Sequence, residues 1–100
     1  MSKMKNACAI SPAVRNEVLE RDGGRCIICG LNNVQIAHYR SRSVGGLGIP
    51  QNLACLCPNC HHEYDNGKLH CQIKNLIEGY LRQHYDNWDE IELIYTKWSF

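Results

Sequence analysis

Four cysteines stand in two Cys-x-x-Cys pairs, and their spacing bears directly on chemistry. The first pair is Cys26 and Cys29, the second is Cys57 and Cys60, and 27 residues separate the two pairs. Four thiolates arranged in this way suit one tetrahedral Zn²⁺ ion with a closed coordination shell. We therefore expect a structural zinc site rather than a catalytic one.

The alternative for such pairs is a redox site of the thioredoxin type. That alternative is disfavoured because there are two pairs and neither lies in a βαβ pattern. The remaining cysteines are Cys8, Cys55 and Cys71. Each is expected to be a small buried apolar residue or a surface thiol, and none is expected to bind the zinc.

A second group of polar residues lies between and after the cysteine pairs. His38 ends an expected strand, Asn52 begins the next one, and His61 and Asp65 share one face of an expected helix. An imidazole and a carboxylate can hold a hard divalent cation, while a second imidazole accepts a proton from water. If the strands pair and the helix folds across them, this combination predicts phosphodiester hydrolysis.

Each of these residues alone also has a structural explanation. A histidine at a strand end is often structural, an asparagine can cap a turn, and an aspartate before Asn-Gly is typical of a helix end. His62 is expected at the surface, although it could replace His61 as a ligand. The order and nesting of the four residues around the zinc pairs are more specific than any one of them.

Local patterns predict the elements that must position these groups. Ser11-Pro12 opens a helix that Gly23-Gly24 ends. Pro58 opens a helix that Asn66-Gly67 ends. The other expectations are strands over 34–38 and 52–56, a loop over 39–51, a core-packing helix over 69–85, and a tail over 88–100 for which periodicity does not decide between helix and strand.

The sequence resembles the HNH endonuclease family, whose fold is called ββα-metal. The resemblance runs from about Arg15 to Leu69, over half the chain. It rests on the runs 21–30, Ala37-His38, Gly45-Gly46, Asn52-Leu53 and 56–61. It implies an α+β fold with a small zinc-stabilised, treble-clef-like ββα-metal core, an N-terminal helix and a C-terminal helix. It also implies one HNH nuclease domain over 1–100, with its core at about 15–69 and a helical extension at about 70–100.

The resemblance also implies roles for three residues. His38 looks like the general base that activates water, and Asn52 looks like the residue that steadies His38 and the loop. His61 looks like a ligand of a catalytic Mg²⁺, Mn²⁺ or other divalent ion. The implied products carry 5′-phosphate and 3′-hydroxyl ends.

One position departs from the family pattern. Many members place Asp, Glu or His just before the base, as a metal ligand, whereas this chain has Ala37. Some members with alanine there carry an aspartate four residues after the metal histidine, as Asp65 follows His61. We therefore expect Asp65 or His62 to supply the missing ligand.

Arg40 and Arg42 follow His38 at a spacing of two. In an extended loop both side chains project to the same side, where they could contact DNA phosphates beside the cut. The structural alternative is a solvated loop.

The chain has 100 residues and a formal net charge of +1, which four thiolates and one Zn²⁺ would change to −1. Any phosphate binding must therefore come from a local patch. The sequence shows no signal peptide and no membrane span, so we expect a cytoplasmic protein. The family resemblance implies DNA as its partner. A homodimer through the residues around Trp88, Tyr95, Trp98 and Phe100 would let one active site per chain cut both strands.

The favoured interpretation is a metal-dependent DNA endonuclease. The first alternative is a zinc-stabilised nucleic-acid-binding module without catalytic activity, for which Ala37 is the best support. The second is a zinc-bound interaction domain that uses its apolar C-terminal part as a partner surface and has no affinity for nucleic acid.

Overall fold

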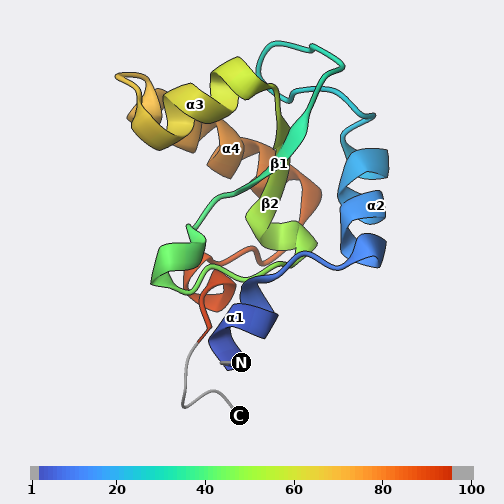
Figure 1. Ribbon diagram of the computed structural model, residues 1–100, viewed down its shortest axis with the longest axis vertical. Coiled ribbons are helices and arrows are strands. Elements are labelled where there is room, and N and C mark those ends of the chain that lie inside the picture. Colours follow the sequence, from blue (N-terminus) through green and yellow to red (C-terminus); the bar gives the residue numbers. More distant parts are fainter. Residues whose placement is uncertain (1–2, 96–100) are drawn as a thin grey trace.

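The computed structural model describes residues 3–95 as a small α+β fold around two antiparallel strands (Figure 1). The expected fold class, a zinc-compatible ββα core with an N-terminal and a C-terminal helix, is confirmed. The elements in chain order are α1 (Lys3–Cys8), α2 (Pro12–Arg21), β1 (Gln35–His38), the 3-10 turns η1 (Arg42–Val44) and η2 (Pro50–Asn52), β2 (Leu53–Leu56), α3 (Pro58–Asn66), α4 (His70–His84) and the 3-10 turn η3 (Glu90–Leu93).

The hairpin of β1 and β2 lies at the centre of the molecule. Its register pairs Gln35 with Leu56 and His38 with Leu53. All four residues of β2 are buried, whereas in β1 only Ala37 is fully buried and Gln35 is exposed. Each strand is one residue shorter at its start than expected, because Val34 precedes β1 and Asn52 belongs to η2.

Helices cover both faces of this hairpin. Helix α2 lies on one side, and α3 and α4 lie on the other (Figure 1). Val18 of α2 packs with Leu53 and Cys55. The larger cluster on the opposite side joins Ala37, Leu56 and the apolar face of α4, whose buried residues are Ile73, Ile77 and Leu81. Hydrophobic burial thus holds β2 on both faces and leaves the end of β1 closer to solvent.

Two helices begin where the capping residues predict. The Ser11 hydroxyl accepts a hydrogen bond from the N–H of Val14 at 3.2 Å, and Pro12 occupies the first turn of α2. The thiol of Cys57 plays the same part for α3, because it accepts from the N–H of Cys60 at 3.4 Å. One zinc-pair cysteine therefore also fixes where α3 starts.

The C-terminal tail folds back as the turn η3. Leu93 is buried, and the Trp88 ring packs edge-on against Tyr39 with ring centroids 5.5 Å apart. Gly46 and Ile94 form a bridge that ties the tail to the loop after β1. Trp88 is buried, so it offers little surface for a homodimer contact. Trp98 and Phe100 lie outside the described residues, and the homodimer stays a prediction.

Within residues 3–95, no helix has the length and apolar character needed to cross a membrane.

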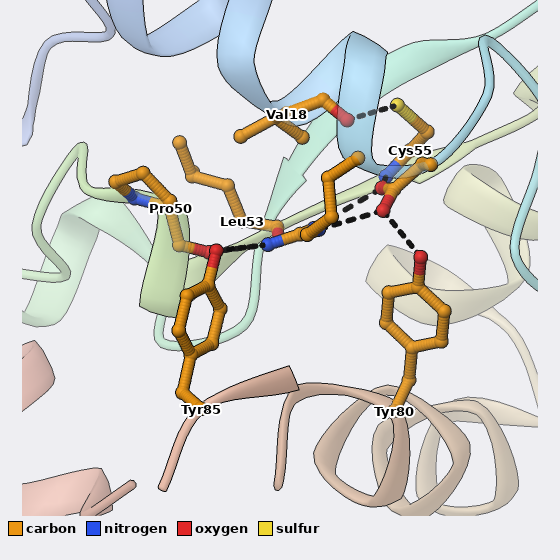
Figure 2. Close-up of polar contacts among 8 residues, drawn as sticks. Val18, Pro50, Leu53, Cys55, Tyr80 and Tyr85 are labelled. Carbon is orange, nitrogen blue, oxygen red and sulfur yellow. Dashed lines mark hydrogen bonds and ion pairs between the residues drawn. The ribbon is translucent and has the colours of Figure 1, made fainter. Parts of the chain in front are cut away.

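A buried ion pair joins α2 to the hairpin and to α4 (Figure 2). Nε of Arg21 lies 2.7 Å from Oδ1 of Asp22, and the Asp22 side chain has no exposed surface. Arg21 also donates to the Leu53 carbonyl at 2.6 Å and to the Tyr85 hydroxyl at 3.1 Å. Asp22 accepts from the Tyr80 hydroxyl and, at 2.9 Å, from the N–H of Cys55.

These bonds keep Asp22 ionised. Burial by itself opposes ionisation, but the donors from Arg21, Tyr80 and Cys55 outweigh it and hold the pKa of Asp22 below its usual value. A depressed folded-state pKa means that this carboxylate stabilises the fold fully above its unfolded pKa of about 3.9. The contribution is lost as the pH falls through the lower pKa of the folded state.

We expect Asp22→Asn to lower the free energy of unfolding by about 3–5 kcal/mol, because it leaves the Arg21 guanidinium buried without its counter-charge. Urea unfolding of the zinc-loaded protein at neutral pH measures this change. Asp86→Asn is the matched control, since Asp86 is exposed and its replacement should change stability by less than about 0.5 kcal/mol. Equal effects of the two variants would contradict a stabilising role for the pair.

Candidate functional site

The four cysteines of the two pairs come together at one end of the hairpin. Their sulfur atoms all lie within 4.8 Å of one another. A tetrahedral Zn²⁺ with Zn–S bonds of about 2.3 Å places its sulfur ligands about 3.8 Å apart, so the cluster fits this ion. The expected grouping of Cys26, Cys29, Cys57 and Cys60 is confirmed.

Backbone bonds shape the first pair into a metal-binding turn. The N–H of Gly30 donates to the Cys26 carbonyl at 2.9 Å, and Gly30 takes a left-handed φ of 81° that favours glycine. Burial opposes ionisation of Cys26, but backbone donors at Cys29, Cys57 and Ile28 outweigh it and lower its pKa to about 7. A thiol that ionises near neutral pH is ready to bind a cation.

The other cysteines lie outside this cluster, as expected. Cys8 and Cys55 are buried, and burial raises the pKa of Cys55 to about 12. Cys71 is exposed on α4.

A separate cleft of about 610 Å³ opens beside the end of β1. It brings together His38, His61 and Asp65, which the sequence singled out, and it also includes Arg40 and Arg42. The remaining lining residues come from the N-terminal segment, β1, the loop after it, α3 and α4, and they are Ile10, Ile36, Tyr39, Ser41, Val44, Tyr64, His70 and Lys74.

His38 stands at the end of β1, half-buried, with its ring on the cleft. Burial lowers its pKa against the opposing effect of a hydrogen bond to the Cys8 carbonyl, and the charge of Arg42, with that of His61 whenever its ring is protonated, lowers it further. A lowered pKa keeps the imidazole neutral at neutral pH, and only the neutral ring can accept a proton.

His61 is oriented by two neighbours. Its Nδ1 lies 2.7 Å from Oε1 of Gln35, and its Nε2 lies 3.4 Å from Oδ2 of Asp65 one helical turn later. An amide oxygen only accepts hydrogen bonds, so Nδ1 carries the hydrogen and the Nε2 lone pair faces Asp65. This is the arrangement that a histidine ligand needs, with its second nitrogen fixed by a polar neighbour.

Gln35 was missed by the sequence analysis. It is the first residue of β1 and lies 26 residues before His61. No local pattern marks it, because its contact exists only once α3 has folded across β1.

Asn52 is fully buried and holds the loop after β1. Its amide oxygen accepts from the N–H of Arg40 at 2.8 Å, and its amide nitrogen donates to the carbonyls of Arg40 and Leu47 at 3.2 and 2.8 Å. Its own carbonyl accepts from the N–H of Tyr39 at 2.7 Å. Asn52 thus binds backbone atoms of Tyr39, Arg40 and Leu47, and it joins the start of the loop to its later part.

The two loop arginines lie in different environments. Arg42 is exposed at the start of η1, whereas Arg40 forms an ion pair with Glu90 of the tail. The loop is not fully extended, because a 3-10 turn begins at Arg42. Lys74 of α4 also lines the cleft and adds a cation that the sequence analysis did not assign.

Three positions that the sequence analysis discussed do not line the cleft, namely Asn52, Ala37 and His62. Ala37 is buried in the core cluster on the α3 and α4 side, and it carries no ligand atom. His62 is exposed, and it is absent from the cleft-lining residues although its neighbour His61 is among them. Of the two candidates for a second ligand, the geometry brings Asp65 to His61.

A solved structure is similar to this chain. It is the Type IV phosphorothioation-dependent restriction endonuclease ScoMcrA, with a TM-score of 0.64 and 29% sequence identity over 74% of this chain. The match covers 19% of that endonuclease, so this chain resembles one part of a much longer enzyme. No family model matches the chain, and no curated protein matches it.

Proposed function

We propose that this chain is a metal-dependent DNA endonuclease of the HNH type that leaves 5′-phosphate and 3′-hydroxyl ends. One observation carries the proposal, namely that a neutral histidine, His38, shares a cleft with the adjacent donors of His61 and Asp65. Similarity to part of a restriction endonuclease supports a nuclease role and DNA as the substrate.

In this proposal His38 takes the proton from the attacking water. Its ring lies on the cleft, is neutral at neutral pH, and sits next to the loop that Asn52 fixes. Asn52 acts by holding the backbone of the loop after His38 rather than by touching the substrate.

His61 and Asp65 are the side chains that would hold a divalent cation. The cation would polarise the scissile phosphate and stabilise the leaving oxygen. Two protein donors leave the remaining coordination positions to water and phosphate oxygens, which is how Mg²⁺ is commonly held. Because Ala37 adds no ligand, we infer that the ion binds weakly without DNA.

We expect Asp65→Ala to weaken divalent-metal activation of cleavage by roughly 10-fold or more, because it removes one of two protein donors. The measurement is the Mn²⁺ concentration that gives half-maximal plasmid cleavage. His62→Ala is the matched variant, since His62 neighbours His61 but is absent from the cleft lining. If His62→Ala raises the Mn²⁺ concentration needed and Asp65→Ala does not, His62 rather than Asp65 is the second metal ligand.

Phosphate binding is assigned to the cationic side chains of the cleft. Arg42 is exposed and free of the ion pair that engages Arg40, so Arg42 carries the larger part of this role, with Lys74 as a second cation of the cleft lining. Contacts with phosphates position the DNA without reading its sequence.

We expect Arg42→Ala to weaken binding to all DNA sequences and to reduce the slope of log K against log salt by about 1. Fluorescence anisotropy with unrelated duplexes over a range of salt concentrations tests this. Lys68→Ala removes an exposed cation that does not line the cleft and should leave the salt slope unchanged. An unchanged slope for Arg42→Ala would remove this residue from the interface.

The first test of the whole proposal is nicking of a supercoiled plasmid by the zinc-loaded protein with and without Mg²⁺ or Mn²⁺. Cleavage that requires the added ion supports the endonuclease. Ala37 supplies no metal ligand at the position before His38. This favours a second candidate, a zinc-stabilised nucleic-acid-binding module without catalysis. That candidate predicts salt-dependent DNA binding and no cleavage with either ion.

A further inference from the structure

Arg40 joins the cleft to an acidic side chain of the C-terminal tail. It is one of the cleft-lining residues, and its Nη1 donates to Oε2 of Glu90 in the turn η3. Glu90 itself does not line the cleft. The two side chains keep 30% and 35% of their surface exposed, so the ion pair is only partly desolvated. The charge of a cleft cation is thus balanced by a carboxylate outside the cleft lining.

Hydrogen bonds on both sides of Glu90 fix the place of this part of the tail. Before Glu90, Nε1 of Trp88 donates to the carbonyl of Gln51 at 2.7 Å. After Glu90, the carbonyl of Leu93 accepts from the N–H of Leu47 at 2.8 Å. Both partners of the tail belong to the segment that joins β1 to β2. The fold of the tail therefore keeps the carboxylate beside the loop that carries the arginine.

The ion pair leaves one hydrogen-bond donor of Arg40 unused. Its Nε is buried and has no hydrogen-bond partner among the residues that the structure describes. A buried N–H without an acceptor is unfavourable, because it has lost its hydrogen bond to water and gained none in exchange. A phosphate can accept from two N–H groups of one guanidinium at once. The guanidinium of Arg40 therefore has a better hydrogen-bonded state available than its pair with Glu90.

The pair of Arg40 and Glu90 is also weak enough to exchange partners. Partly exposed ion pairs contribute little to stability, because water and salt screen their attraction. A DNA phosphate that enters the cleft competes with the carboxylate for the same guanidinium. Arg42, two residues later, is exposed and stands outside this pair, so it can bind a phosphate without giving up a partner.

We propose that Glu90 competes with DNA phosphate for Arg40 and thereby limits the affinity of the cleft for duplex DNA. Arg40 contacts a phosphate only by exchanging its carboxylate partner for phosphate oxygens, whereas Arg42 needs no exchange. The inference rests on the proposed DNA substrate, but it does not depend on cleavage. Glu90 is then an affinity-determining residue of the DNA site, placed there by the tail that follows α4.

Glu90→Gln removes the competing charge and keeps the shape of the side chain. We expect it to strengthen binding to unrelated duplexes by roughly 3- to 10-fold at low salt, because one more cation becomes available to phosphate. The slope of log K against log salt should become steeper by about 1 for the same reason. Fluorescence anisotropy of the zinc-loaded protein, without added Mg²⁺ or Mn²⁺, measures the affinity and the slope.

Glu92→Gln is the matched control. Glu92 lies on the same turn as Glu90, but it is exposed, does not line the cleft and is not the partner of Arg40. The exchange removes the same charge, so it reports only the long-range effect of net charge, which salt screens, and it should strengthen binding by less than about 2-fold. Equal effects of the two variants would overturn the proposal, because net charge alone would then explain both.

The Arg40→Ala background gives a second test. Without the guanidinium Glu90 has nothing to withhold from phosphate, so Glu90→Gln should then strengthen binding no more than Glu92→Gln does. A Glu90→Gln effect that persists in full without Arg40 would refute the competition.

The outcomes also separate this inference from the proposed function. Weaker DNA binding by Glu90→Gln would overturn the inference, since Glu90 would then be directing Arg40 toward the phosphate. Unchanged binding by Glu90→Gln, in a protein that cleaves plasmid, would refute this inference alone. Stronger binding that requires Arg40, in a protein that does not cleave with either ion, would refute the nuclease and support the competition.

Discussion

Replacing His38 with alanine is expected to lower kcat for plasmid cleavage by roughly 10²- to 10⁴-fold, the usual contribution of a general base. The side chain lies on the cleft with a lowered pKa, so it is available to accept a proton at neutral pH. The measurement is the initial rate of nicking at saturating DNA and Mn²⁺, with DNA binding checked separately by anisotropy.

The pH dependence of kcat should reflect the lowered pKa of His38. A base with a lowered pKa stays active to lower pH than an ordinary histidine, so wild-type kcat should fall only below the usual histidine range of about 6.5. His84→Ala is the matched control, because His84 is exposed on α4, contacts the Tyr80 ring at a tilt and does not line the cleft. Equal rates for His38→Ala and His84→Ala would remove His38 from the chemistry.

Removal of the zinc is expected to unfold the protein. Structural Zn²⁺ contributes an apparent free energy of about 10–16 kcal/mol in small domains at neutral pH, which is comparable with or larger than the whole stability of a domain, about 5–15 kcal/mol. Here the ligands join the turn after α2 to the start of α3, so metal loss also removes the cap of α3 at Cys57. Loss of the near-UV circular dichroism on adding a strong zinc chelator, and its return with Zn²⁺, measures this effect.

Cys57→Ser provides the corresponding variant. It should fail to hold one zinc per chain and should lose the cooperative thermal transition. Cys71→Ser makes the same exchange at an exposed cysteine outside the cluster and should retain both the metal and the transition. Normal folding of Cys57→Ser without bound metal would show that side-chain packing alone is sufficient to fold the chain.

The features that the sequence predicted correctly depend on local signals. The cysteine spacing, the Ser11-Pro12 and Pro58 helix starts and the Asn66-Gly67 helix end each occupy a few adjacent residues, and all appear as expected. Placement of His38, His61 and Asp65 in one cleft also agrees with expectation, because the hairpin and α3 have the predicted order. Their catalytic roles stay predictions.

The features that the sequence analysis missed depend on contacts between distant segments. Gln35 meets His61 only after α3 crosses β1, and Lys74 reaches the cleft only because α4 packs on α3. The ion pair of Arg40 was missed for the same reason, since its partner Glu90 lies 50 residues away. The tail could not be assigned because η3 is a short turn held by contacts with the 45–47 loop, and such a turn has no periodicity of its own.

The buried ion pair of α2 has a consequence for the order in which the chain is made. The hydroxyl partners of Arg21 and Asp22 follow them by 64 and 58 residues, on and just after α4. During synthesis both charges leave the ribosome long before Tyr80 and Tyr85, so until then the ion pair has only its own two members and the hairpin backbone as partners. A nascent chain that has not yet released α4 would also lack His70 and Lys74, which line the cleft, so the cleft would be completed late in translation.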